Sequence, residues 1–534
     1  MNRKQMIQTM SSHKKPWDIC IIGGGATGLG AAVDAASRGF STILLEQYDF
    51  AKGTSSRSTK LVHGGVRYLQ QGNIRLVMEA LHERGLLKKN APHLVKNQSF
   101  IVPNYKWWEG PFYGIGLKVY DWMAGRLGLG SSQFLSREET LERAPTLDPE
   151  GLRGSVIYHD GQFDDARLAI NLAQTAADQG ATLMNYCPVV GFLKKRNQIS
   201  GVRVRDNLNK QDYELQAKVI INATGVFADY LLQMDQPGVE SILAPSQGVH
   251  IVLDKEFLPG ESAIMVPHTD DGRVLFAVPW HHKIIIGTTD TAVHPQTVGE
   301  LLEPIALDAE VEFILEQIGH YLSRDPTEKD IRSVFAGLRP LVRSTSKKTA
   351  ELSRDHLISV SDSGLITITG GKWTTYRRMA EDVINTAIKK SGLPDRPCVT
   401  AELRIHGAKD ETDFEAPLYY YGSDANALQS LVDKNPALAE ALHPELPYLK
   451  AEIIWAVQNE MCMTVEDALS RRTRALLLNA QAALNASEIV AKIMAEEMGN
   501  DAGWISQQLE EFKSVAQHYL PAAQRQKQKL KLNI

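Results

Sequence analysis

Two short apolar runs, residues 18–22 and 41–45, frame the clearest pattern in the chain. Continuous apolar runs of this length are typical of strands buried on both faces of a parallel sheet. Between them, the alanine-rich stretch 29–39 predicts a helix that ends at Arg38-Gly39. The pattern therefore predicts a strand–helix–strand unit of about thirty residues near the start of the chain.

The remaining periodicities predict a discontinuous α/β unit, an inserted antiparallel sheet and a helical end. Residues 245–290 are rich in strands and predict the inserted sheet, and helical patterns dominate after about residue 395. The other expected elements are a helix at 169–179, a strand at 181–190, a hairpin of 198–205 with 213–215, a buried strand at 218–222, an amphipathic helix at 305–322, a strand at 365–369 and a helix reaching about residue 389.

Composition narrows the class of protein only slightly. The 534 residues carry 58 Lys and Arg against 63 Asp and Glu, a net charge of −5, so a globally basic nucleic-acid-binding surface is excluded. A hydrophobic content of 43% excludes disorder as the main state. The four cysteines lie far apart, which favours free thiols over a disulfide framework or a thiolate metal site, and no metal is expected.

The glycine-rich turn between the first strand and its helix carries a dinucleotide fingerprint. Gly23 permits the tight turn, Gly25 lets the backbone approach a pyrophosphate, and Gly28 allows the helix to pack closely on the strand. The helix N-terminus offers N–H groups to the phosphates. Glu46, at the end of the second strand, suits a ribose diol and disfavours NADP. The hydroxyl-rich segment 53–60 that follows suits a pyrophosphate, or is a solvated loop.

Three further features are candidates for function. Residues 332–354 hold six basic residues and one acid, a local excess that suits an anionic ligand, whereas a solvated loop is the preferred interpretation for Lys347 and Lys348. Gly370 and Gly371 begin a second helix that could face a cofactor. Aromatic residues cluster at 105–122, a pattern typical of a membrane interface or of core packing: Tyr105, Trp107, Trp108, Phe112, Tyr113, Tyr120 and Trp122.

Nine segments together make the chain resemble the FAD-dependent, respiratory glycerol-3-phosphate dehydrogenase family. They are IIGGGATGLG, GTSSRSTKLVHGGVRYL, DDARL, INATGVFAD, IIIGTTDT, AGLRPLV, LSRDH, GGKWTTYRRMAE and MTVEDALSRRTR. The resemblance implies FAD and a Rossmann-like fold of the amino-acid-oxidase-like (glutathione-reductase-type) class. It also implies three units: an FAD-binding domain of residues 16–100, 150–240 and 355–392, a sheet-based substrate domain of 101–149 and 241–354, and a helical domain of 395–534.

Site residues follow from the same resemblance. Substrate would meet Arg67, Tyr68, Arg339, Arg354 and Lys372, with His250, Arg339 and Lys372 as the catalytic groups and His250 as the base. FAD would contact Gly23, Gly25, Gly28, Glu46, Ser55, Ser56, Ser58, His63, Gly64, Gly65, Ala223, Gly225 and Gly371. Many relatives have Asn where this chain has Ala26-Thr27, which puts one cofactor contact in doubt.

The implied reaction is oxidation of sn-glycerol 3-phosphate to dihydroxyacetone phosphate, with hydride transfer to N5 of FAD and electrons passed to a membrane quinone. The chain is expected to be cytoplasmic and attached peripherally to the inner face of the cytoplasmic membrane; a homodimer is among the assemblies allowed, and no nucleic acid is expected. Two alternatives remain open: a soluble oxidase that reduces oxygen to hydrogen peroxide, and a flavin-binding sensor without turnover.

Overall fold

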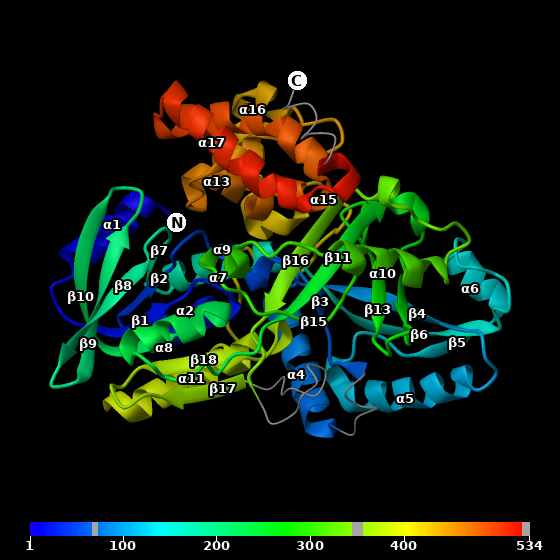
Figure 1. The fold of residues 1–534 in the computed structure, drawn as a ribbon, viewed down its shortest axis with the longest axis horizontal. Coiled ribbons are helices and arrows are strands. Elements are labelled where there is room, and N and C mark those ends of the chain that lie inside the picture. The colour runs from blue at the N-terminus through cyan, green and yellow to red at the C-terminus, as the bar shows by residue number, and fades with distance from the viewer. Residues whose placement is uncertain (67–72, 344–355, 526–534) are drawn as a thin grey trace.

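The computed structural model describes residues 1–66, 73–343 and 356–525. Two large sheets lie side by side, and a helical unit packs across the top of both (Figure 1). Arg67, Tyr68, Arg354, Lys347 and Lys348 fall outside the described residues.

The first sheet contains the predicted strand–helix–strand unit. β1 (Trp17–Ile22) pairs in parallel with β2 (Thr42–Leu45) and with β10 (Gln211–Asn222). Its strand order is β17-β18-β10-β1-β2-β7, a mostly parallel sheet. The other strands are β7 (Thr182–Met184), β8 (Val189–Lys195), β9 (Gln198–Asp206), β17 (His356–Val360) and β18 (Ile366–Gly370).

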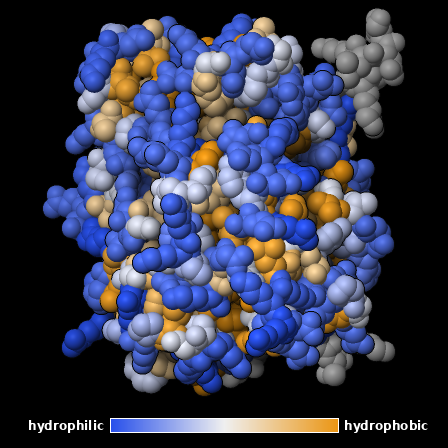
Figure 2. Space-filling view, turned by 90° about the vertical axis from the view of Figure 1, so that its left-hand side faces the viewer, coloured by the Kyte–Doolittle hydropathy of each residue, from blue (hydrophilic) through white to orange (hydrophobic). Residues whose placement is uncertain are grey.

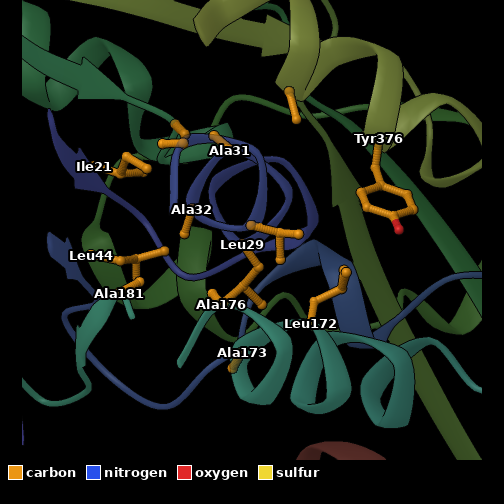
Figure 3. Packing of buried hydrophobic residues seen from close by; sticks show 14 of the residues in the cluster. Ile21, Leu29, Ala31, Ala32, Leu44, Leu172, Ala173, Ala176, Ala181 and Tyr376 are labelled. Atoms are coloured by element: carbon orange, nitrogen blue, oxygen red, sulfur yellow. The ribbon is translucent and has the colours of Figure 1, made fainter. Parts of the chain in front are cut away.

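Alternate side chains of β1 explain how this sheet is covered. Ile19 and Ile21 face a layer of helices, whereas Cys20 and Ile22 face the hairpin β9–β10 and α1 (Arg3–Ser12). The helical layer is α2 (Ala26–Ser37), α7 (Asp165–Asp178) and α11 (Tyr376–Ser391), and its alanines and leucines interdigitate in Figure 3. Residues 19–22 of β1 are buried on both faces of the sheet, which explains why they form a continuous apolar run.

Figure 2 shows the end of the molecule that carries this sheet, where apolar side chains lie scattered among polar ones. Scattered exposed apolar residues are normal for a protein surface. The other helices of the first two units are α4 (Ile74–Asn90), α5 (Glu109–Ala124), α6 (Arg137–Arg143), α8 (Ala228–Asp235), α9 (Val298–Leu302) and α10 (Asp308–Gly319).

The second sheet is mostly antiparallel, as the strand-rich pattern predicts. Its order is β15-β11-β14-β13-β12-β4-β6-β3, with β16 beside β11 and β5 beside β6. The strands are β3 (Leu61–Val62), β4 (Lys96–Asn104), β5 (Gln133–Leu135), β6 (Gly154–Gln162), β11 (Ser246–Asp254), β12 (Ala263–Val266), β13 (Leu275–Trp280), β14 (Lys283–Gly287), β15 (Thr291–Ala292) and β16 (Ser333–Arg339).

The chain crosses between the two sheets more often than the unit boundaries expected from the sequence imply. Residues 61–62 and 154–162, placed in the FAD-binding unit from sequence, form β3 and β6 of the second sheet. An apolar run predicts a strand but not which neighbour the strand pairs with, so sequence alone does not resolve this exchange.

The C-terminal unit is helical, as expected. Its helices are α12 (Ala425–Lys434), α13 (Lys450–Asn459), α14 (Val465–Asp467), α15 (Ala475–Leu478), α16 (Ala480–Met498) and α17 (Ala502–Ala516). Its core extends onto the second sheet, where Val252 and Phe335 join the same buried cluster. No helix among the described residues combines the length and the apolarity needed to cross a bilayer.

Candidate functional site

A cavity of about 560 Å³ opens between the two sheets. Ligand pockets are typically about 300–1,000 Å³. Four segments of the first unit line it: the glycine-rich turn after β1, residues 45–66, residues 223–234, and the Gly370–Thr374 turn after β18. The second sheet closes the cavity with residues of β11, β13 and β16.

The turn after β1 has the geometry that a pyrophosphate requires. Gly23 adopts φ +113°, and a Cβ there would lie 2.6 Å from the carbonyl oxygen of Ala223. A Cβ at Gly28 would lie 1.9 Å from the carbonyl oxygen of Gly23, which is the close packing expected of this glycine. Gly25 is the N-cap residue of α2 and has no side chain to cover the helix end. It lines the cavity together with the first turn of the helix.

Glu46 stands where the ribose acid was expected. Its carboxylate accepts hydrogen bonds from the Gly24 N–H at 2.6 Å and the Tyr48 N–H at 2.8 Å. Burial raises the pKa of Glu46, and these N–H groups act against the rise. The carboxylate lines the cavity and is held rigidly beside the turn, where it can accept further hydrogen bonds from a diol.

Most of the expected cofactor residues come together on the cavity wall. These are Gly23, Gly25, Glu46, Ser55, Ser58, His63, Gly65, Ala223, Gly225 and Gly371. Three do not line it: Gly28, Ser56 and Gly64. Gly28 acts through packing, the Ser56 carbonyl accepts from Lys60 Nζ, and the Gly64 N–H donates to the Tyr120 hydroxyl at 2.8 Å. Position along a motif does not distinguish a residue that touches a ligand from one that supports its neighbour.

His250 lies on β11 and is only 3% exposed. Its ring stacks on Phe335 with the centroids 4.7 Å apart, and Nε2 lies 2.9 Å from Oγ1 of Thr59. Burial, aided by the positive charges of Lys60 and Arg339, lowers the pKa of His250 well below its usual value. A neutral imidazole at the cavity wall can accept a proton at neutral pH.

Arg339 lines the same wall, and its side chain lies in the space that a side chain at position 248 would fill. Gly248 on β11 pairs with Gly337 on β16, and a Cβ at Gly248 would lie 2.4 Å from Nη2 of Arg339. The guanidinium donates to the Thr289 carbonyl at 3.0 Å and the Thr288 hydroxyl at 3.1 Å. These bonds orient the guanidinium in the cavity before any ligand arrives.

The basic stretch 332–354 does not act as one cluster in the described residues. Arg332 pairs with Asp254, and Arg343 donates to the Leu243 carbonyl, so neither lines the cavity. Among the described basic residues of this stretch, Arg339 alone lines the cavity. Lys372 lines the cavity from the opposite side, directly after the Gly370–Gly371 turn, in which both glycines have positive φ.

Several site residues were missed from sequence. Thr59 and Arg273 line the cavity, and Lys60 and Asp165 form a fully buried ion pair at 2.6 Å behind Thr59. A lysine inside a hydroxyl-rich segment is typical of a solvated loop, so the sequence alone does not indicate a role for Lys60. Asp165 is the first residue of α7, and the preceding Asp164 caps this helix by accepting a hydrogen bond from the Arg167 N–H. The described residues hold no cluster of His, Cys, Asp and Glu suited to a metal ion.

The residues present fit FAD. The cavity joins a glycine-rich helix N-terminus, a buried carboxylate and a second glycine turn, which are the donor and acceptor types that a pyrophosphate, a ribose and an extended ring system require.

Comparison with known proteins gives a consistent result. The family model described as FAD dependent oxidoreductase matches residues 18–377, and the C-terminal domain of alpha-glycerophosphate oxidase matches residues 365–504. The mitochondrial glycerol-3-phosphate dehydrogenase of Homo sapiens is 41% identical over 95% of this chain and 74% of its own length. A probable mitochondrial glycerol-3-phosphate dehydrogenase of Caenorhabditis elegans is 40% identical over 96% of this chain and 74% of its own length.

Comparison with solved structures gives the same kinds of protein as the sequence relatives. The glycerol-3-phosphate dehydrogenase of Bacillus halodurans, complexed with FAD, superposes with a TM-score of 0.75 at 29% identity and 97% coverage of both chains. The L-alpha-glycerophosphate oxidase of Mycoplasma pneumoniae shares the fold, with a TM-score of 0.56 at 18% identity over 73% of this chain and 99% of its own. The expected fold class is confirmed.

Proposed function

The chain belongs to the FAD-dependent glycerol-3-phosphate dehydrogenase family, and from that premise we propose that it oxidises sn-glycerol 3-phosphate to dihydroxyacetone phosphate. The observation that carries the proposal is the convergence of His250, Arg339 and Lys372 on the cavity that also contains the glycine-rich turn. A base and two cations in one cavity match a substrate that has a hydroxyl proton to lose and a phosphate to hold.

The residues assigned to FAD divide by chemistry. Gly23, Gly25 and the start of α2 would hold the pyrophosphate, and Glu46 the ribose. The wall formed by His63, Gly65 and Gly371 would hold the ring system. Bound FAD supplies the acceptor for the hydride that leaves the carbinol carbon.

The chain's own residues perform the remaining work. Arg339, already oriented by Thr288 and Thr289, binds the substrate phosphate with its planar guanidinium. His250, neutral because it is buried beside positive charge, accepts the hydroxyl proton. Lys372 stabilises negative charge on the substrate oxygen from the opposite wall. The carbinol carbon is thereby oriented, which is the main benefit of binding the remote phosphate.

We propose that the electrons pass to a membrane quinone. We also propose that the outer face of α5 is the surface that contacts the membrane. Trp108, Phe112, Ile115, Val119 and Trp122 recur at helical spacing along this face and are exposed, Trp122 at 82%. The opposite face, with Tyr113, Leu117 and Tyr120, is buried. A helix that is apolar on both faces needs a second apolar environment for the outer one.

The neighbours of this face favour a lipid surface. Trp107, 76% exposed, precedes the helix, and Phe134 of β5 joins Ile115, Val119 and Trp122 around a shallow groove of about 330 Å³. Lys106, Lys118 and Arg126 are exposed at the same helix. Tryptophan with basic residues is the combination that binds a bilayer interface with anionic lipids. We place this contact at the inner face of the cytoplasmic membrane.

The acceptor is tested with purified holoenzyme and glycerol 3-phosphate. A quinone dehydrogenase reduces a soluble quinone analogue rapidly under argon and yields little peroxide in air. Stoichiometric hydrogen peroxide in air, with slow quinone reduction, would instead establish the soluble oxidase. Absence of both products would leave only a flavin-binding sensor.

A further inference from the structure

The segment 463–474 (MTVEDALSRRTR) belongs to the C-terminal unit, yet its charges are buried against the FAD-binding unit. A capping box at Thr464 and Asp467 starts α14, and one π-helical turn, Ala468–Arg472, follows. Arg471, Arg472 and Arg474 are each 2% exposed. Arginines buried this deeply need acceptors, and here part of those acceptors, Asp49, Ser56 and Asp165, come from the FAD-binding unit.

Asp49, just before the hydroxyl-rich segment, accepts from two of these arginines. Its carboxylate lies 2.5 Å from Nε of Arg471 and 2.7 Å from Nη1 of Arg472. Burial alone would raise the pKa of Asp49, but the charges of Arg472 and Arg471 hold it below the usual value. Beside this cluster, Glu466 pairs with Lys52 at 2.5 Å.

Arg474 reaches further along the same segment, to the turn formed by residues 56–60. Its Nη2 donates to the Ser56 carbonyl at 2.7 Å and to Oδ1 of Asp165 at 3.2 Å. Its Nη1 donates to the Ser470 carbonyl at 2.7 Å, which ties the guanidinium to the preceding π-helical turn. Arg474 thus joins the C-terminal unit to both a turn and the start of α7.

Two other residues of the turn use the same acceptors. Nζ of Lys60 donates to the Ser56 carbonyl at 2.8 Å and to Oδ2 of Asp165 at 2.6 Å. The hydroxyl of Ser58 donates to Oδ2 of Asp165 at 2.7 Å. The Ser56 carbonyl and Asp165 therefore anchor the turn, and Arg474 is the cation that reaches both from the C-terminal unit.

Thr59 lies between these anchored residues and is the side chain of the turn that meets the base. Its Oγ1 lies 2.9 Å from Nε2 of His250, and it lines the cavity. The path from Arg474 to the imidazole is continuous: Arg474 to Ser56 and Asp165, then the turn backbone to Thr59, then His250.

We infer that Arg474 is a positioning residue for the proton-accepting His250, acting through the 56–60 turn, so that the C-terminal unit completes the active site of the first two units. The inference rests on the proposed function, in which His250 is the base. Supporting groups of this kind fix the orientation of the groups that react, and a displacement of about 1 Å at a reacting group lowers turnover by about a hundredfold.

The test compares two buried arginines at the same boundary, as full-length holoenzymes. Arg474→Gln removes the charge that anchors the turn. Arg167→Gln is the matched control, because Arg167 on α7 also joins the C-terminal unit, through Glu460 at 2.5 Å and the Arg472 carbonyl at 2.6 Å, without contacting the turn. Hydrogen–deuterium exchange of peptides spanning 54–62 reports on the turn, and kcat and KM for glycerol 3-phosphate report on the site.

Arg474→Gln should lower kcat by about ten- to a hundredfold while KM changes little, because the phosphate contact at Arg339 is untouched. Hydrogen–deuterium exchange of the peptides spanning 54–62 should be faster in Arg474→Gln than in the wild type. Arg167→Gln should lower the unfolding temperature yet leave both readouts near wild type. Arg474→Lys, which keeps the charge but not the planar fork, should fall between wild type and Arg474→Gln, and it decides by the same readouts if Arg474→Gln does not fold.

Wild-type exchange across 54–62 in the Arg474 variants would overturn the inference. So would a kcat loss equal to that of Arg167→Gln, because it would reduce Arg474 to a general interface contact. Failure of the proposed function is a separate result: the wild-type enzyme would not oxidise glycerol 3-phosphate, whereas the exchange comparison would still report whether Arg474 anchors the turn.

Discussion

Thr59 Oγ1 and His250 Nε2 lie 2.9 Å apart, which joins the hydroxyl-rich segment 53–60 of the first unit to β11 of the second sheet. The same segment is held elsewhere: the Thr54 hydroxyl donates to the Leu338 carbonyl at 2.6 Å, and Trp373 Nε1 donates to the Ser55 carbonyl at 2.8 Å. The imidazole is therefore oriented by a segment that is itself anchored to both sheets.

Thr59→Val removes this hydrogen bond at nearly constant side-chain volume. We expect kcat to fall by about fivefold, since a hydrogen bond contributes about 1 kcal/mol net and about 1.4 kcal/mol corresponds to tenfold. Thr59→Ser keeps the hydroxyl and should stay near wild type. Steady-state kinetics on samples of equal flavin content make the comparison; equal rates for Val and Ser would remove Thr59 from the account.

Lys60→Met tests why His250 is neutral. Burial, the Lys60 charge and the Arg339 charge all lower the pKa of His250, so removing Lys60 should raise it. A base works in its neutral form, and the acid limb of the kcat/KM profile should therefore move to higher pH. The variant keeps Arg339, the other positive charge that acts on His250. Asp165, which loses Lys60, keeps Arg474 as its ion-pair partner.

The control for this profile is Lys52→Met, at a lysine of the same segment that pairs with Glu466 instead. Its acid limb should stay at the wild-type position. A shift of the Lys60→Met limb to lower pH, or an identical shift in both variants, would contradict the assignment of His250 as a base tuned by Lys60.

Gly28→Ala tests the packing that brings α2 against the turn. The new Cβ would lie 1.9 Å from the Gly23 carbonyl oxygen, so the turn must move and flavin content should fall sharply. Gly116→Ala adds a methyl group in open space within α5 and should retain flavin with equal or slightly greater stability. Flavin-to-protein absorbance ratios after gel filtration measure both; full flavin content in Gly28→Ala would refute the packing role.

Trp122→Glu tests the proposal that the outer face of α5 contacts a membrane. Replacing an indole that is 82% exposed with a carboxylate should strongly reduce flotation with liposomes containing anionic lipid and leave turnover with a soluble acceptor unchanged. Val399→Glu, also at an exposed apolar side chain, lies in the segment that leads to the C-terminal unit and should float as wild type does. Equal flotation of both variants would show that α5 is not the contact.

Much of the fold could be predicted because its signals are local. The apolar run of β1, the glycine turn and the helix after it lie within about thirty residues, and each needs its own residue type. The exchange of β3 and β6 into the second sheet could not be predicted, because strand pairing depends on contacts distant in sequence.

The site divides in the same way. Gly23, Gly25 and Glu46 carry their chemistry in their spacing, and Arg339 and Lys372 came from the family resemblance. Lys60, Asp165 and Arg474 carry no local signal, because a buried ion network is assembled from three separate segments. The aromatic cluster at 105–122 divides between two environments: Tyr113 and Tyr120 are buried in the core, whereas Trp107 and Trp122 are exposed to solvent.

The most direct test of the central claim is anaerobic titration of the purified holoenzyme with sn-glycerol 3-phosphate, followed by flavin absorbance. One equivalent of substrate should bleach the flavin with one equivalent of dihydroxyacetone phosphate formed, and His250→Gln, with its flavin retained, should bleach about a hundredfold or more slowly. An absorbance spectrum that glycerol 3-phosphate leaves unchanged in the wild-type enzyme would contradict it.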